Sequence, residues 1–224
     1  MSKIKTIDIE SVEGYEYRLN ISNDNYIKKA INEIEKIVRS SQEYRNYIKY
    51  LKENVNMNRC AFFNNVNSDV SKVKIEIHHE PLTLYDIVQT VLNKHIIENN
   101  GIVNAYEVAE EVMMLHYKDM VGLIPLSITL HEMVHSSDKI KIPLHLVYGN
   151  YIKFIDEYEQ YIDDKVITKL ENKIKETKLL TEDSFKDIQV EFSYLNVDNF
   201  SLPQIISDDN DDVLETSGND YSVA

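Results

Sequence analysis

Hydrophobic residues recur at helical spacing over most of the chain. Residues 24–52 carry a stripe of mainly isoleucine and valine in this pattern, which predicts helix, and the serine pair at 40–41 is a point at which it can break. Two further stripes follow Thr83 and Asn104, and each of these residues has an acidic residue three positions on, which is typical of a helix start. The same pattern predicts one long, highly charged helix over residues 150–178.

Other segments lack the helical pattern. Alternation of apolar and polar residues predicts strands at 15–21, 73–79 and 188–195. The apolar segment at 120–126 predicts a strand or an extended loop, and a helix is expected from about residue 128 to about residue 137. We expect loop at 54–69, a short extended stretch at 139–147 and a disordered tail beyond about residue 207.

These elements together predict an α+β protein. A length of 224 residues suits one domain of ordinary size, or a compact domain with appendages. The predicted parts, in chain order, are a strand-helix region at 1–60, a core at 61–150, a charged helix and strand at 151–206, and an acidic tail at 207–224.

The net charge of −14 argues against nucleic acid as a partner, but its distribution weakens that objection. Residues 181–224 hold 11 acidic residues and 1 basic residue, so the first 180 residues carry only −4. A core with so little net charge suggests that affinity for DNA would come from a homodimer or from a protein partner.

The single cysteine, Cys60, excludes an intramolecular disulfide and a cysteine-based zinc site. We therefore expect a reducing cytoplasm as the location. No run of 18 or more apolar residues is present, so we expect no membrane partner.

Four of the seven histidines fall in two tight pairs, which suggests a metal site. His131 and His135 are four residues apart on a predicted helix, so they share a face and can bind one cation. His78 would supply a third imidazole and leave positions open for water and substrate. His79 points to the other face of its strand, where it can act as a general base, because imidazole titrates near neutral pH.

The segments EIHH at 76–79 and LIPLSITLHEMVH at 123–135 resemble the HNH (ββα-metal) endonuclease family, which includes the colicin DNases. The resemblance covers about residues 73–145. It implies a ββα-metal core with inserted helices and hydrolysis of phosphodiester bonds in DNA, in which a divalent cation (Mg2+, Mn2+, Ni2+ or Zn2+) acts as a Lewis acid.

The family's site residues transfer to this chain position by position. By that likeness His79 is the general base, and the metal ligands are His78, His131 and His135. Glu76 is the acidic residue before the pair. It either orients an imidazole or an arginine, which places it with His79 at the catalytic site, or it is an exposed strand residue.

Two departures from the family pattern point to a divergent nuclease or an inactive one. Gly122 stands where the family's middle asparagine is expected, and Asp119 is the residue nearest to a substitute. About forty residues are inserted between the histidine pair and the second strand. The divergent form of the motif resembles phage proteins, for which the cytoplasm would be that of the host.

Two alternatives stay open. HEMVH is also the HExxH motif of zinc metallopeptidases, in which His131 and His135 would bind zinc, Glu132 would be the base, and Glu157 or Glu159 would be the third ligand. That interpretation leaves the pair at 78–79 unexplained. The other alternative is a catalytically dead HNH scaffold that binds DNA or protein.

Overall fold

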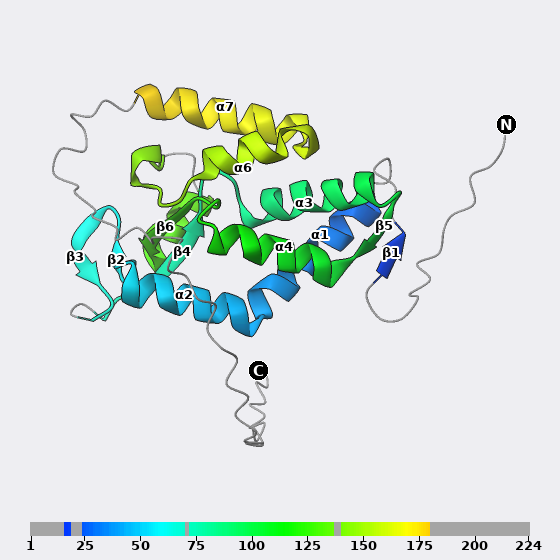
Figure 1. Cartoon of the computed structure of the whole chain (residues 1–224). Helices are drawn as coiled ribbons and strands as arrows, with labels where there is room; N and C mark the ends of the chain where they lie inside the picture. Colours follow the sequence, from blue (N-terminus) through cyan, green and yellow to red (C-terminus); the bar gives the residue numbers. More distant parts are fainter. Residues whose placement is uncertain (1–15, 19–23, 70–71, 137–139, 180–224) are drawn as a thin grey trace, which may run out of the picture. The chain divides into compact units, whose positions relative to one another are not determined.

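The helices and strands of the computed structural model are drawn in Figure 1. The structure describes residues 16–18, 24–69, 72–136 and 140–179, all of which belong to one unit of the chain, Met1–Tyr194. The helices are α1 (Asp24–Ser40), α2 (Gln42–Asn54), α3 (Leu84–Glu98), α4 (Ala105–Tyr117), α5 (Ile128–Ser136), α6 (Tyr151–Tyr158) and α7 (Asp164–Leu179). The strands are β1 (Glu16–Arg18), β2 (Arg59–Cys60), β3 (Phe63–Asn67), β4 (Ile75–His79), β5 (Ile102–Asn104) and β6 (Leu123–Ser127). This mixture confirms the α+β class.

Capping residues set the helix starts where the sequence predicts them. The Ser41 side chain accepts the Tyr44 backbone N–H and begins α2, so the first predicted helix is divided at the serine pair. Thr83 forms a reciprocal capping box with Asp86 at the start of α3. Asn104 caps α4, because its side chain accepts the backbone N–H of Tyr106. The local sequence therefore places the starts of α3 and α4, and it marks that of α2 as a possible break.

The main hydrophobic core lies between helices. The apolar face of α1, which includes Ile31, Ile34 and Val38, is fully buried and packs against α3 and α4. Residues of α2 and α6 join the same core, as does Val166 of α7. One core therefore runs across the boundaries predicted near residues 60 and 150.

Two predicted elements differ from the structure. The long helix at 150–178 is two helices, α6 and α7, with the 3-10 turn η2 (Glu159–Tyr161) between them. The break has a local cause, because the Asp163 side chain accepts the Lys165 N–H (2.9 Å) and its carbonyl accepts the Val166 N–H (2.8 Å), which together begin a new helix. The loop predicted at 54–69 contains the β2–β3 hairpin.

The 139–147 stretch contains the 3-10 turn η1 (Leu144–Leu146). The strand predicted at 188–195 and the tail beyond 207 lie outside the described residues.

The element that positions the histidines is the antiparallel pair β4–β6. His78 lies opposite Ile124 and His79 lies opposite Leu123. Helix α5 follows β6 directly and contacts both strands. The roughly forty inserted residues form α3, β5 and α4, which leave the end of β4 and return the chain to β6. Within the part of the chain that is described, no helix has the length and apolar character needed to cross a membrane.

Candidate metal centre

Three histidines meet where α5 packs on β4. One ring nitrogen from each of His78, His131 and His135 lies within 4.8 Å of the others. The Nε2 atoms of His131 and His135 are 3.2 Å apart, and the His78 ring centroid is 5.1 Å and 5.0 Å from the other two. His78 is buried, His131 is half-buried and His135 is exposed. The cluster therefore has one side in the protein and one toward solvent.

Strand alternation and helical spacing bring these side chains together. Successive residues of β4 face opposite sides, so Glu76 and His78 share the face that meets α5. Residues four apart on α5 lie one turn apart on the same face, as predicted. The start of α5 is fixed to β4 by the Ile128 backbone N–H, which donates to the Lys74 carbonyl at 3.1 Å.

Glu76 orients one of the three imidazoles. Its Oε2 atom lies 2.6 Å from Nδ1 of His131, and its Oε1 atom lies 2.5 Å from the Lys74 ammonium. The hydrogen bond from Lys74, followed by the one from His131, lowers the pKa of Glu76, so the carboxylate is ionised and accepts the Nδ1–H of His131. With Nδ1 as the donor, the neutral form of the ring offers its Nε2 lone pair, through which imidazole binds a metal. Of the two sequence interpretations of Glu76, the orienting contact matches the structure.

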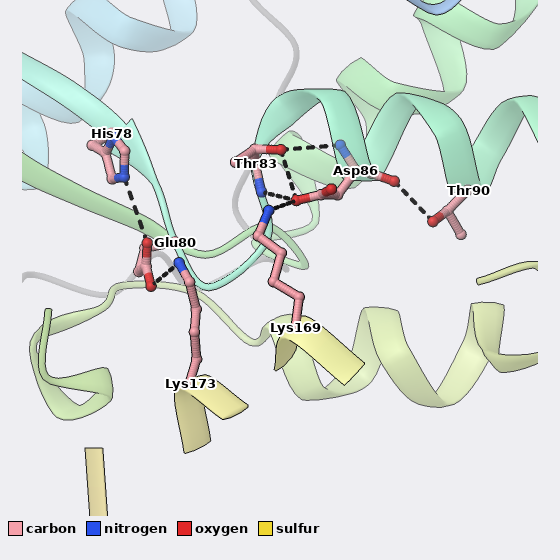
Figure 2. Close-up of polar contacts among 7 residues, drawn as sticks. All are labelled: His78, Glu80, Thr83, Asp86, Thr90, Lys169 and Lys173. Atoms are coloured by element: carbon pink, nitrogen blue, oxygen red, sulfur yellow. Dashed lines mark hydrogen bonds and ion pairs between the residues drawn. The ribbon is translucent and has the colours of Figure 1, made fainter. Parts of the chain in front are cut away.

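Glu80 is a second carboxylate at the cluster, and it was not among the predicted site residues. Its Oε2 atom is 3.5 Å from Nε2 of His78, and its Oε1 atom contacts the Lys173 ammonium of α7 (Figure 2). Burial alone would raise the pKa of Glu80, but the contacts with His78 and Lys173 outweigh it and leave the pKa below its ordinary value. Glu80 follows the histidine pair directly, which is a signal that sequence reasoning can use. Lys173 carries no such signal.

The donor set fits a borderline transition metal better than a hard cation. Three imidazoles with carboxylates behind two of them match the ligands and outer partners of Zn2+ or Ni2+ sites. Mg2+ prefers oxygen ligands and keeps several waters. The residues present therefore fit a three-histidine centre for Zn2+ or Ni2+, with the exposed side available for further ligands.

The structure does not bring His79 to this cluster. Its side chain points to the other face of β4, as the alternation predicts, but there it is buried, with 5% of its surface exposed. Its Nε2 atom lies 3.0 Å from Nε2 of His116 in α4, and the Tyr44 ring is stacked alongside. The assignment of His79 as a general base remains a prediction, and the core packing now separates it from solvent.

The neighbours of His79 fix which proton it carries. Nδ1 of His116 lies 2.7 Å from the Val112 carbonyl, which can only accept, so Nδ1 of His116 is protonated. Burial lowers the pKa of His116 to about 4, so near neutral pH its Nε2 is an acceptor. His79 then donates from its own Nε2, and burial lowers its pKa well below the ordinary value. His79 is a neutral imidazole in the structure.

Gly122 has a structural reason to be a glycine. A Cβ atom at this position would lie 1.9 Å from the Glu80 carbonyl oxygen and 3.0 Å from Cγ1 of Val147. The Glu80 backbone N–H also donates to the Gly122 carbonyl at 3.0 Å. The family's asparagine therefore has no room here. Asp119 accepts a hydrogen bond from the Tyr148 hydroxyl at 2.8 Å, and the Tyr148 backbone pairs with Leu123 of β6.

The residues of the metallopeptidase alternative are arranged less favourably. Glu132 lies on α5 between the two helix histidines and is exposed. The third donor at the cluster is His78 rather than Glu157 or Glu159. Glu157 is paired with Lys153 on α6 at 3.8 Å, and Glu159 lies in the exposed turn η2.

Comparison with known protein families shows that this α+β chain with a histidine cluster is a phage protein. It matches the model of the bacteriophage G278-like virion protein family over residues 2–199, and it belongs to that family. The phage association expected from the divergent motif is thus confirmed. No curated protein and no solved structure matches the chain.

Proposed function

We propose that this virion protein binds a divalent transition metal through His78, His131 and His135, and that β4, β6 and α5 form a ββα-metal unit that hydrolyses phosphodiester bonds in DNA. The observation that carries the proposal is the meeting of the three imidazoles within 4.8 Å, in the strand-strand-helix order that the motif resemblance implies. Of the two histidines on β4, His78 faces α5 and completes the cluster, whereas His79 faces the core.

Each residue of the unit has a defined task in this proposal. The three histidines hold the cation, and Glu76 keeps His131 in the tautomer that binds through Nε2. When bound, the cation supplies Lewis-acid stabilisation of charge on the phosphate and the leaving oxygen. The exposed side at His135 is where a DNA phosphate would approach, and neutral His79 is the candidate to accept a proton from water.

The burial of His79 favours a second candidate function. A base that is 5% exposed and bonded to His116 reaches water only if the packing around β4 opens. If it does not open, the cation is structural. The unit would then stabilise a virion protein that binds DNA or another protein, as in the inactive-scaffold alternative.

Nicking of supercoiled plasmid separates these candidates. The wild-type chain would be tested with Zn2+, Ni2+, Mn2+ and Mg2+ beside His135→Ala, His79→Gln and Glu132→Ala. His79→Gln keeps an N–H donor for His116 but removes the base. The nuclease proposal predicts that His135→Ala loses cleavage, that Glu132→Ala keeps it, and that His79→Gln slows it by about 10²- to 10⁴-fold.

Other results would redirect the assignment. If the wild-type chain binds one zinc but cleaves DNA with none of the four metals, the nuclease is contradicted and the structural centre is supported. Digestion of casein that is lost in Glu132→Ala would support the peptidase instead. Circular dichroism of each variant would show that the fold is intact.

A further inference from the structure

Two lysines one turn apart attach helix α7 to Glu80, the residue after β4, and to Asp86 in the first turn of α3. Lys169 lies 2.6 Å from Oδ2 of Asp86, and Lys173 contacts Oε1 of Glu80. Figure 2 shows the two lysines reaching from α7, Lys173 to Glu80 and Lys169 to Asp86. The two ion pairs are alike in chemistry, but only Glu80 also contacts the metal centre.

Glu80 is shared between α7 and a proposed metal ligand. Its side chain is 5% exposed, so its charge depends on protein partners for compensation. One oxygen contacts Lys173 and the other lies 3.5 Å from Nε2 of His78. A single buried carboxylate therefore connects the end of β4 to a helix about ninety residues further along the chain.

We propose that Glu80 is a positioning residue for His78, and that a cation at the histidine cluster tightens the docking of α7 through Glu80 and Lys173. The proposal rests on the cation site of the proposed function. A cation that binds one nitrogen of His78 polarises the ring and makes its other N–H a stronger donor. Glu80 is then held in one orientation, and Lys173 binds an ordered carboxylate at a smaller cost in side-chain entropy.

The coupling is reciprocal. If the cation favours docked α7, then docked α7 must raise the affinity for the cation by the same factor. Removal of the Lys173 charge should therefore weaken zinc binding, by about fivefold for a coupling at the low end of the usual range. Loss of the Glu80 carboxylate should weaken it by about 10- to 100-fold, as for other carboxylates that orient metal-binding histidines.

Lys169 offers a matched control on the same helix. Its partner Asp86 accepts from the Thr83 backbone N–H (2.8 Å) and hydroxyl (2.7 Å) at the start of α3. Asp86 is not part of the histidine cluster. Lys169→Met removes an ion pair of the same kind from α7 without touching the connection to His78.

Hydrogen exchange of the full chain tests the coupling. Amide exchange in α7 would be followed by mass spectrometry with and without Zn2+, and zinc binding would be measured by calorimetry. We expect zinc to slow α7 exchange by about fivefold or more in the wild type and in Lys169→Met. The zinc response should be lost in Lys173→Met and in Glu80→Gln. It should be retained in Lys173→Arg, which keeps the positive charge of the side chain.

Three results would overturn the proposal. If the wild type binds zinc and α7 exchange does not change, the coupling is wrong while the cation site stands. If Lys169→Met loses the response as Lys173→Met does, the effect is general helix stability and not the Glu80 connection. If calorimetry finds no zinc bound, the cation site and the coupling fail together.

Discussion

At the scale of single residues, His78 and His79 differ because a strand turns them in opposite directions. His78 faces α5 and has a carboxylate beside it, whereas His79 faces the core and pairs with His116. The opposite directions can be predicted from the sequence, because alternation is a property of any strand. The partner of His79 cannot, because His116 is 37 positions away and is brought close only by the packing of α4.

The buried His79–His116 pair predicts that the fold weakens in mild acid. In the unfolded chain an imidazole has a pKa of about 6.5, whereas burial lowers the pKa of His116 to about 4 in the folded chain. The unfolded state therefore binds more protons as the pH falls below about 6.5, and stability is lost in that direction. Between about pH 7 and about pH 5 we expect a loss of about 2 kcal/mol from His116 alone.

Urea unfolding of the metal-free chain across this pH range would measure the effect. His116→Gln should give a shallower dependence of the free energy of unfolding on pH. Equal slopes for the wild type and the variant would contradict the buried neutral pair.

Gly122 makes a second prediction at this scale. Gly122→Asn restores the asparagine of the HNH pattern, but its Cβ would overlap the Glu80 carbonyl oxygen at 1.9 Å. We expect a loss of about 3 kcal/mol or more in the free energy of unfolding, because the obstacle is backbone. A thermal melt of the variant that matches the wild type would show that the segment can move aside.

At the scale of elements, the local sequence predicts those that carry their own signals. The starts of α2, α3 and α4 each have a side-chain cap; the sequence predicts those of α3 and α4, and gives that of α2 as a possible break in one helix. The β2–β3 hairpin was missed because its position depends on a distant contact, in which the Ala61 N–H donates to the Pro125 carbonyl at 2.8 Å. The α6–α7 break was missed because one aspartate, Asp163, competes with a continuous helical pattern.

The cap of α3 can be tested on its own. Thr83→Ala removes the side chain that accepts the Asp86 N–H at 3.2 Å, and we expect a cost of about 1 kcal/mol in the free energy of unfolding. Thr168→Ala, at an exposed position within α7, is the control and should change stability much less. Equal effects of the two substitutions in urea unfolding would mean that the cap adds nothing.

At the scale of the whole described unit, the site is built from residues far apart in the sequence. The inserted α3, β5 and α4 pack in the core with α1 and return the chain to β6, so the insertion does not separate His78 from His131. The cluster could be predicted because two short periodic patterns and one motif resemblance converge on it. The attachment of α7 could not, since nothing in the sequence distinguishes Lys173 from the other lysines of that helix.

The most direct test of the account is a zinc titration of the metal-free chain by calorimetry. We predict one Zn2+ per chain, with binding lost in His78→Ala and in His135→Ala. Binding should be kept in His145→Ala, because this exposed histidine lies outside the cluster. No binding by the wild type, or binding that survives both cluster substitutions, would contradict the metal centre and the functions proposed from it.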